Sequence, residues 1–412
     1  MLSVSEAEAT IFNLVSPLDN QQDIEIVDLL AADSRILASA VASQLDFPYW
    51  DNSAMDGYAV RYADVQQATQ QQPAILEIVE EIPAGYQPQS TIRPGQAARI
   101  FTGAVMPAGA DTVVMQENTQ RQEKRVLILT APQKPQEFVR QRAAYYKAGT
   151  QLLPPGIMLH GSEIAVLATA QCTQVSVYRR PRVAIFSTGN ELVPPENPLQ
   201  PGQIVDSNQY ALAALVRQSG AEPLMLGIVP DEPAALEKAI AYAVSNADIV
   251  ISSGGVSVGD YDYVEQIIKS LEGKIHIQAV AMKPGKPFTV ATFRDQVIYF
   301  GLPGNPASAL VTFWRFVQPT IKKVSGLVDG WQPKFIKALN HQELRSNGKW
   351  ETYFWGKLHL QNGIYEFHLA GGTQSSGNLI NLAQINALAV ISVGQTLISS
   401  GEEVQVLLNE FG

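Results

Sequence analysis

Residues 248–262 have the sequence Asp-Ile-Val-Ile-Ser-Ser-Gly-Gly-Val-Ser-Val-Gly-Asp-Tyr-Asp. The apolar residues at the start predict a buried strand, and the glycines that follow predict a tight loop at its end. In such a loop, backbone N–H groups and the N-terminus of a following helix can bind an anion. An ordinary glycine turn with a capping aspartate is the alternative, but the clustered serine and aspartate residues favour a phosphate or cofactor site.

Two kinds of ligand group are expected in this loop. Hydrogen-bond donors to the bound molecule would come from Gly254, Gly255, Ser257 and Gly259. Asp262, at the end of the loop, is a hard oxygen ligand of the kind that suits Mg²⁺ beside phosphate groups.

The sequence before this loop alternates between predicted strands and helices. A second buried strand is expected at residues 182–186, and helices at 209–219 and 233–244 separate it from the strand that begins at Asp248. This alternation favours a parallel-rich sheet, in which ligands bind beyond the carboxyl ends of the strands. We therefore predict an α/β domain over residues 179–328.

Polar and acidic side chains also follow the predicted strands of this domain. They are Glu191, Asp206, Asn208 and Asp231. Each one alone would more often be a helix cap or a solvated charge. If the sheet is parallel, the loops that carry them converge, and as a set they indicate metal binding or acid–base chemistry.

Two proline-rich turns flank a segment that resembles a β-hairpin. They are Lys283-Pro-Gly-Lys286-Pro and Leu302-Pro-Gly-Asn-Pro306. The prolines rigidify both turns, and the glycines allow close approach of the backbone. Lys283 and Lys286 offer positive charge to an oxyanion or a phosphate. Taken alone, two rigid turns with solvated lysines would explain the pattern equally well.

The segments 1–46 and 150–178 are expected to be helical. Apolar residues at helical spacing predict one helix over residues 5–14 and a second over 28–44. Ser162 is the expected N-cap of a third helix. We expect this third helix to rejoin the N-terminal helices, so that the two segments form one linker domain.

The segments 47–149 and 329–412 contain short β-like runs separated by turn residues. The first would be a β-rich inserted domain, and the second a small C-terminal β-barrel-like domain. The expected fold class is therefore a multidomain α/β plus β protein with a central α/β domain and a helical linker domain.

Composition excludes several classes of function. The chain has 412 residues and a net charge of −10, which argues against nucleic-acid binding. No apolar run approaches the roughly 20 residues that span a membrane, and the first residues do not resemble a secretory signal. The single cysteine, Cys172, excludes an intrachain disulfide. We expect a cytoplasmic protein.

Several catalytic patterns are missing from the sequence. It has no thiol nucleophile and no zinc-ligand spacing. Their absence disfavours hydrolase and metalloprotease functions.

Six motifs occur in the order typical of the MoeA family, which includes the E domains of gephyrin and of its plant counterpart. Four of them are the glycine loop, the two proline-rich turns and the segment Ser187-Thr-Gly-Asn-Glu-Leu. The others are Asp51-Asn-Ser-Ala-Met-Asp-Gly-Tyr-Ala and Thr102-Gly-Ala. The chain resembles this family over nearly its whole length.

The resemblance implies an elongated, four-domain homodimer in which the helical domain also serves dimerisation. Residues 179–328 would bind molybdopterin. The implied reaction inserts molybdate into adenylated molybdopterin, releases AMP and is assisted by Mg²⁺. The protein partners that the resemblance implies are the molybdopterin adenylyltransferase and acceptor molybdoenzymes. A non-catalytic cofactor carrier or gephyrin-like scaffold is the second hypothesis, and the lack of a long linker or fused domain favours the enzyme.

The resemblance also implies roles for individual residues. The catalytic set would be Asp56, Thr102, Glu191, Asp231, Asp262 and Lys283. Asp231 and Asp262 would hold Mg²⁺ against the pyrophosphate. Further substrate contacts would come from Lys286, Pro303, Pro306 and one of Ser375 or Ser376.

Three positions depart from the family pattern. Tyr145 stands where an aspartate is expected, Ala279 stands where some members have a lysine, and an arginine expected near Trp355 is missing. Either subfamily variation or reduced activity would account for these departures.

Overall fold

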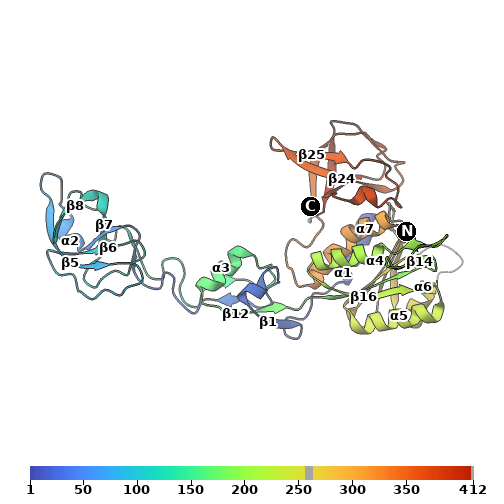
Figure 1. The fold of residues 1–412 in the computed structure, drawn as a ribbon, viewed down its shortest axis with the longest axis horizontal. Coiled ribbons are helices and arrows are strands. Elements are labelled where there is room, and N and C mark those ends of the chain that lie inside the picture. Colours follow the sequence, from blue (N-terminus) through green and yellow to red (C-terminus); the bar gives the residue numbers. More distant parts are fainter. Residues whose placement is uncertain (256–262, 410–412) are drawn as a thin grey trace. The chain divides into compact units, whose positions relative to one another are not determined.

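The computed structural model describes residues 1–255 and 263–409. They form two compact units, of which the first comprises 1–39, 155–165 and 173–412 and the second 40–154 and 166–172 (Figure 1). This division is coarser than the four predicted domains, whose bounds stay a prediction. No helix in the described part of the chain is both long and apolar enough to cross a membrane.

A six-stranded mixed sheet lies at the centre of the first unit, in the order β16-β13-β17-β21-β20-β18. The first four strands are parallel, β20 pairs antiparallel with β21, and β18 pairs antiparallel with β20. The predicted parallel-rich sheet and the predicted hairpin, β20–β21, are both confirmed. The bounds are β13 Arg182–Thr188, β16 Glu222–Val229, β17 Ile249–Ser253, β18 Lys274–Ala279, β20 Pro287–Thr292 and β21 Ile298–Leu302.

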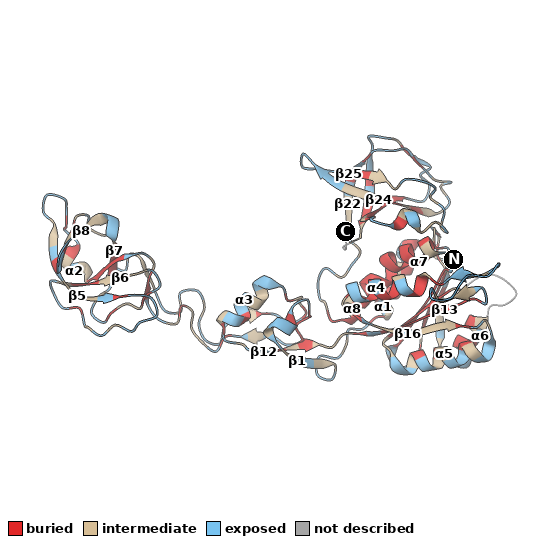
Figure 2. Ribbon diagram, viewed as in Figure 1, coloured by how far each residue is buried: buried red, intermediate tan, exposed pale blue. Residues whose placement is uncertain are grey.

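Helices cover both faces of this sheet because its strands are apolar on both sides. In β13, Val183 and Ile185 pack into one core while Ala184 and Phe186 pack into the other. Buried residues fill almost all of α7 (Figure 2). The first face carries α1 Val4–Leu14, α4 Asn208–Gln218, α7 Pro306–Thr312 and α8 Gln318–Val324, and the second α5 Pro233–Asn246 and α6 Tyr263–Ser270.

The C-terminal strands of the first unit form a closed barrel. Each strand pairs with two neighbours, and β24 pairs with β26 to close the ring. Apolar residues such as Phe367 and Ala389 fill the interior, which confirms the predicted barrel-like domain. The ring comprises β22 Phe335–Asn340, β24 Glu351–Gln361, β25 Ile364–Leu369, β26 Ala387–Ile391 and β28 Glu403–Leu408, and β19 Met282–Lys283 pairs beside β24.

The second unit is built on another six-stranded sheet, in the order β7-β4-β6-β5-β9-β8. Apolar clusters cover both of its faces, so the predicted β-rich segment is confirmed. The strands are β4 Gly57–Val60, β5 Ala74–Ile82, β6 Gln96–Ile100, β7 Thr112–Met115, β8 Thr119–Gln122 and β9 Arg125–Ile128. Smaller elements of this unit are α2 Tyr62–Val65, β3 Asn52–Ser53 and β10 Val139–Arg140.

The predicted helix over residues 28–44 was wrong. Only Leu29–Ala32 forms a short 3₁₀ turn. Ile36 and Leu37 instead form bridges to Met158 and Val177, because tertiary backbone pairing outweighs the helical spacing of the apolar residues.

Strands, in place of the expected helices, join the two predicted linker segments. The pairs are β1 Ile24–Asp28 with β12 Gln174–Tyr178 and β2 Val41–Ala42 with β11 Gln151–Leu153. The third helix, α3, spans Gly161–Thr169, so Ser162 lies inside its first turn and is not its N-cap. The Ser162 hydroxyl donates to the Glu163 carboxylate, which also accepts the His160 N–H.

Candidate active site

The connections of the α/β sheet reverse direction between β13 and β17. From β13 the chain crosses through α4 to β16 on one side, and from β16 it returns through α5 to β17 on the other side of β13. The loops that leave Thr188 and Ser253 therefore diverge, and a crevice opens beyond the strand ends. Ligands of open α/β sheets bind at such a point.

A pocket of about 680 Å³ lies at these strand ends. Residues far apart in the sequence line it, as expected for parallel strands. Those predicted from the sequence are Glu191, Asp206, Asn208, Asp231, Gly254, Gly255, Pro303 and Pro306. We call it the acid-lined pocket. The predicted residues Ser257, Gly259 and Asp262 lie outside the described part of the chain.

Gly254 allows the end of β17 to lie close to the end of β13. Its φ of +92° falls in the region that favours glycine, and a Cβ there would lie 2.4 Å from the Thr188 carbonyl oxygen. Its N–H donates to the Leu302 carbonyl at 3.1 Å. Glycine at this position therefore holds three neighbouring strand ends together at the pocket.

Asp206 is a buried carboxylate that positions other residues. It follows the two-strand ribbon of β14 Leu192–Val193 and β15 Ile204–Val205. Oδ1 accepts the Ser187 hydroxyl at 2.9 Å, and Oδ2 accepts the Gln209 side-chain amide at 3.0 Å. With both oxygens engaged and only 3% of the residue exposed, Asp206 fixes the start of α4.

Asn208 has a buried acceptor that no described residue satisfies. Its side-chain amide donates to Ser253 Oγ at 2.7 Å and to the Gly304 carbonyl at 2.8 Å. These two bonds fix the orientation of the amide. Its Oδ1 is buried and has no hydrogen-bond partner among the described residues. Because an unpaired buried acceptor is costly, this oxygen is suited to accept an N–H from a bound molecule.

Asp231 and Glu191 supply carboxylates to the same pocket. Asp231 Oδ1 accepts the Thr188 hydroxyl, and its N–H donates to Asn190 Oδ1 at 3.2 Å. Glu191 is exposed and its carboxylate lies over Gly189, where a Cβ would come within 2.8 Å of Oε2. Both acids therefore have oxygens available to a ligand or a cation.

A second pocket of about 370 Å³ has a different charge. Lys283, Lys286 and Arg345 line it, and we call it the basic pocket. Lys286 Nζ lies 5.5 Å from the centre of the Trp350 ring, at cation–π distance. Pro287 and Ser308 line both pockets, so the two adjoin.

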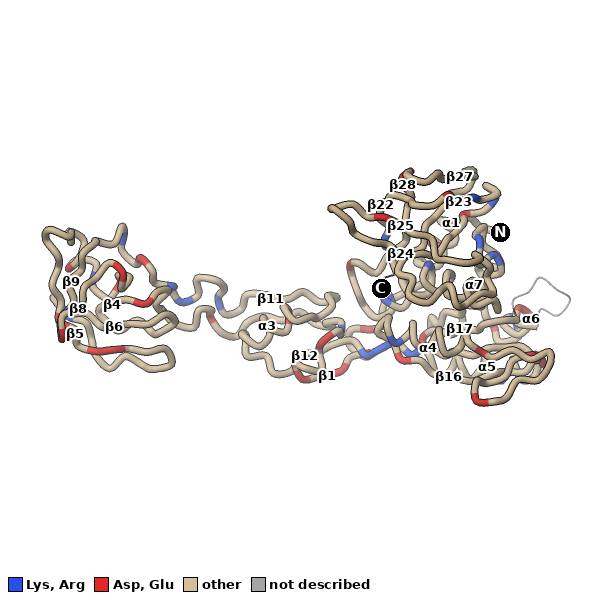
Figure 3. Tube along the Cα trace, turned by 45° about the horizontal axis from the view of Figure 1, so that its top comes forward, with Lys and Arg blue, Asp and Glu red and all other residues tan. Residues whose placement is uncertain are grey.

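Sequence reasoning missed Arg345. It lies in β23 Leu344–Arg345, which pairs with β27 Leu397–Ile398, and Figure 3 shows basic residues near β23. Its guanidinium contacts Glu343 at 2.5 Å. Only folding brings this residue beside the Lys283 turn, so no local pattern could have revealed it.

Of the two candidate serines, Ser376 lines the basic pocket and Ser375 lines neither pocket.

Asp56 and Thr102 lie in the second unit and form a hydrogen-bonded pair. Asp56 Oδ1 accepts the Thr102 N–H at 2.7 Å and the Thr102 hydroxyl at 2.8 Å. These two bonds hold the pKa of Asp56 below its usual value, and the bond from the backbone N–H has the larger effect. The positive charge of Arg99 lowers the pKa further. Asp56 is thus an exposed, ionised carboxylate with a fixed orientation.

The aspartate expected at position 145 is replaced by an aromatic contact. Tyr145 is 63% exposed, and its ring centre lies 5.6 Å from that of Phe47. Phe47 also stacks on Tyr146 at 5.4 Å. This position therefore carries no carboxylate toward a site.

Three family models match successive parts of the chain. They are "MoeA N-terminal region (domain I and II)" at residues 2–170, "Probable molybdopterin binding domain" at 184–323 and "MoeA C-terminal region (domain IV)" at 337–408. A Nostoc protein named molybdopterin molybdenumtransferase is 68% identical, over 99% of this chain and 94% of its own. The chain belongs to the MoeA family.

Other MoeA relatives agree over the full length. A Haemophilus influenzae protein with the same name is 34% identical over 98% of each chain. The crystal structure of a Pyrococcus horikoshii MoeA protein superposes with a TM-score of 0.84 at 28% identity, over 99% of this MoeA chain and 100% of its own. Membership of the family gives this chain a role in molybdenum cofactor biosynthesis.

Proposed function

We propose that this MoeA protein is a molybdopterin molybdenumtransferase, which inserts molybdate into adenylated molybdopterin and releases AMP. The observation that carries the proposal is the pair of adjoining pockets of opposite charge. Adenylated molybdopterin is large and carries a pyrophosphate, whereas molybdate is a small oxyanion. The two reactants need binding sites that differ in character and lie next to each other. The relatives named molybdopterin molybdenumtransferase support a transferase function.

The acid-lined pocket would bind adenylated molybdopterin together with Mg²⁺. The side chains of Glu191, Asp231 and Thr188 offer only oxygen ligands there, and Mg²⁺ prefers oxygen. Asp231 is the described residue best placed to hold the ion, and Asp262 is the second proposed ligand. When bound, Mg²⁺ would neutralise negative charge on the pyrophosphate. The Asn208 acceptor would orient the organic part of the substrate.

The basic pocket would hold molybdate. Lys283, Lys286 and Arg345 would offset its negative charge, and Ser376 would donate a hydroxyl hydrogen bond. The rigid Pro-Gly turn holds both lysines at the pocket. Bringing the two reactants together in a fixed orientation accounts for catalysis without a covalent nucleophile.

We also propose a homodimer in which the Asp56–Thr102 pair of one subunit serves the reaction in the other. The fixed, ionised and exposed carboxylate of Asp56 supports a catalytic role. Mixing the variants Asp56→Asn and Asp231→Asn tests this, because each variant lacks a different one of the two carboxylates that the shared site needs. In a two-fold dimer, random mixing at equal amounts would restore about a quarter of wild-type activity. Complete inactivity of the mixture would contradict the shared arrangement.

The overall proposal is tested by molybdate insertion in vitro. Purified protein, adenylated molybdopterin, molybdate and Mg²⁺ should yield molybdenum cofactor and AMP, and omission of any one should stop AMP release. The molybdopterin adenylyltransferase and acceptor molybdoenzymes are the proposed partners on either side of this step. Tight binding of adenylated molybdopterin without AMP release would instead support the carrier or scaffold hypothesis.

A further inference from the structure

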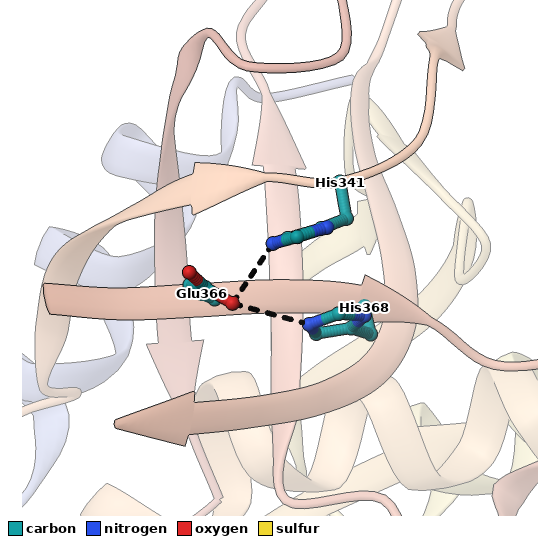
Figure 4. A group of neighbouring side chains, drawn as sticks. All are labelled: His341, Glu366 and His368. Atoms are coloured by element: carbon teal, nitrogen blue, oxygen red, sulfur yellow. Dashed lines mark hydrogen bonds and ion pairs between the residues drawn. The ribbon is translucent and has the colours of Figure 1, made fainter. Parts of the chain in front are cut away.

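Three histidines and a glutamate gather on the outer face of the C-terminal barrel. Glu366 and His368 lie two residues apart on β25 and therefore point to the same side (Figure 4). His359 of β24 stands directly opposite Glu366, and His341 follows β22 on the other side of β25. The chain has only five histidines, so this face of three adjacent strands holds most of them.

The ligand atoms of three of these side chains are close enough to share an ion. His341 Nε2 lies 2.9 Å from Glu366 Oε2, and His368 Nε2 lies 3.7 Å from the same oxygen. Ligand atoms from all three residues lie within 4.8 Å of one another. In a tetrahedral zinc site, with metal–ligand bonds near 2.1 Å, neighbouring ligand atoms are about 3.4 Å apart. The two pair distances bracket that value.

His368 offers a nitrogen that the fold leaves unused. Its Nε2 is buried and has no hydrogen-bond partner among the described residues. A buried polar atom without a partner is costly, and a role as a metal ligand would account for it. The nitrogen faces the Glu366 carboxylate, which already accepts a bond from His341.

The backbone fixes His341 beside this nitrogen. Its N–H donates to the Phe367 carbonyl at 3.0 Å, and its carbonyl accepts the Ser400 hydroxyl at 2.8 Å. Glu366 and His368 lie within the regular pairing of β24 with β25. The barrel thus fixes the backbone of all three residues.

We propose that His341, Glu366 and His368 form a site for one zinc-class divalent transition-metal ion. Two imidazole nitrogens and one carboxylate oxygen suit Zn²⁺, and they do not suit Mg²⁺, which takes oxygen ligands. His359, whose ring meets that of His368 edge-on at 5.1 Å, is a neighbouring side chain that would supply the fourth ligand. This is the one such His, Cys, Asp and Glu cluster found among the described residues.

Binding requires the two principal imidazoles to turn. The His341 and His368 rings are stacked with centres 4.0 Å apart and planes 19° apart, whereas an imidazole donates its lone pair in the ring plane. The His341 side chain is 43% exposed, so it has room to rotate toward the ion. Lys357, opposite His368 on β24, donates to Gln384 Oε1 at 2.9 Å, so another partner already engages its ammonium.

Calorimetric titration of the full-length, chelator-treated protein with Zn²⁺ tests the proposal. The expected stoichiometry is one Zn²⁺ per chain, unaffected by excess Mg²⁺. Zinc binding should weaken at least about tenfold in each of the variants His341→Ala, Glu366→Gln and His368→Ala. Removing a residue that only hydrogen-bonds to a metal ligand already causes a loss of that size. His160→Ala, which removes an exposed histidine elsewhere, is the matched control and should bind like wild type.

Thermal unfolding provides a second measurement that does not depend on the proposed transferase activity. Zn²⁺ should raise the melting temperature of the wild type and of His160→Ala, because it binds the folded state. It should not do so for His341→Ala, whose exposed side chain can be removed without disturbing the fold. Absence of Zn²⁺ binding by the wild type, or equal binding by wild type and His341→Ala, would overturn the site.

Discussion

The two pockets of the first unit differ in charge and in how the chain builds them. The acid-lined pocket is made chiefly by loops at one edge of one sheet. It offers carboxylates and the Asn208 acceptor, which has no partner within residues 1–255 and 263–409. The basic pocket joins the Lys283 turn to the C-terminal barrel through residues such as Arg345. Under the proposed function, the α/β domain therefore supplies most of the surroundings for the phosphate-bearing substrate, with Gly377 and Leu379 added from the C-terminal segment. Oxyanion binding would require the Lys283 turn and the barrel together.

Asp231→Asn should have the largest effect. It removes a negative charge from the acid-lined pocket but keeps an acceptor for the Thr188 hydroxyl, so the fold should survive. We expect molybdate insertion to fall about 100-fold or more, comparable to the loss of one preorganised electrostatic contact. More Mg²⁺ should be needed for the remaining activity. The assay is AMP release at a series of Mg²⁺ concentrations.

Glu232→Gln is the control for this variant. Glu232 is an exposed acid directly next to Asp231 and does not line the pocket. It should retain wild-type activity and Mg²⁺ dependence. Equal losses in the two variants would show that general surface charge, and not the position of Asp231, governs the reaction.

Lys283→Ala should act on molybdate and not on stability. Removing one cation from the basic pocket should raise the half-saturating molybdate concentration about tenfold, which equals about 1.4 kcal/mol. Lys349→Ala, an exposed lysine outside the pocket, is the matched control. A large fall in melting temperature with unchanged molybdate dependence would show that Lys283 serves the fold instead.

The double change Lys283→Ala with Lys286→Ala sharpens the assignment. If both ammonium groups face one anion, their combined effect should exceed that of either change and should depart from simple additivity. Measuring the rate against molybdate concentration for the two single variants and the double variant gives the size of each effect and its departure from additivity. Strictly independent effects would mean that Lys286, which also contacts Trp350, serves a different ligand.

Gly254→Ala should destabilise the strand ends at the acid-lined pocket. A left-handed alanine alone costs about 1–2 kcal/mol. At Gly254 the new Cβ would also meet the Thr188 carbonyl, and overpacking adds about 1–3 kcal/mol. Gly202→Ala has a similar φ of +88° with nothing within 4 Å, so it should show only the first cost. The urea concentrations at the unfolding midpoints of the two variants give the comparison. Equal shifts from wild type would show that residue 254 does not lie close to the Thr188 carbonyl.

The smallest expected effect is the change that Thr102→Ala makes to the pKa of Asp56. The change removes the hydroxyl donor and keeps the backbone N–H, which is the larger cause of the lowered pKa. The pKa should therefore rise only part of the way toward its usual value. Carboxyl chemical shifts measured against pH would show this, with Thr69→Ala as the control. No change, or a complete return to the usual value, would contradict the assignment.

The lowered pKa of Asp56 also sets the sign of its pH effect. Because the folded-state pKa lies below the unfolded one, ionised Asp56 favours the folded state above the unfolded pKa. That contribution is lost as the pH falls through the lowered folded-state pKa. Thr102→Ala should reduce this dependence.

Features coded by neighbouring residues were predictable from the sequence. The strand before Gly254 and the convergence of Glu191 with Asp231 follow from apolar runs and from parallel topology. The hairpin between the two proline-rich turns was equally local. The helix predicted at residues 28–44 failed because Ile36 and Leu37 form bridges to Met158 and Val177, which lie more than a hundred residues away in the sequence.

Features built from distant segments could not be predicted. Arg345 reaches the Lys283 turn only because the barrel packs beside the α/β domain. His341 and His368 share no metal-ligand spacing in the sequence and meet only where β22 pairs with β25. Both cases depend on contacts between segments that are far apart in the sequence, which local patterns do not specify.

A measurement of molybdate binding tests most directly which pocket binds molybdate. Equilibrium dialysis compares three proteins: the wild type, the variant Asp231→Asn, and a double variant that combines Lys283→Ala with Arg345→Ala. The method separates the contributions of the two pockets without requiring turnover. The pocket assignment predicts that Asp231→Asn binds molybdate like wild type, while the double variant binds it at least about tenfold more weakly. Unchanged binding in the double variant, or loss of binding in Asp231→Asn, would contradict it.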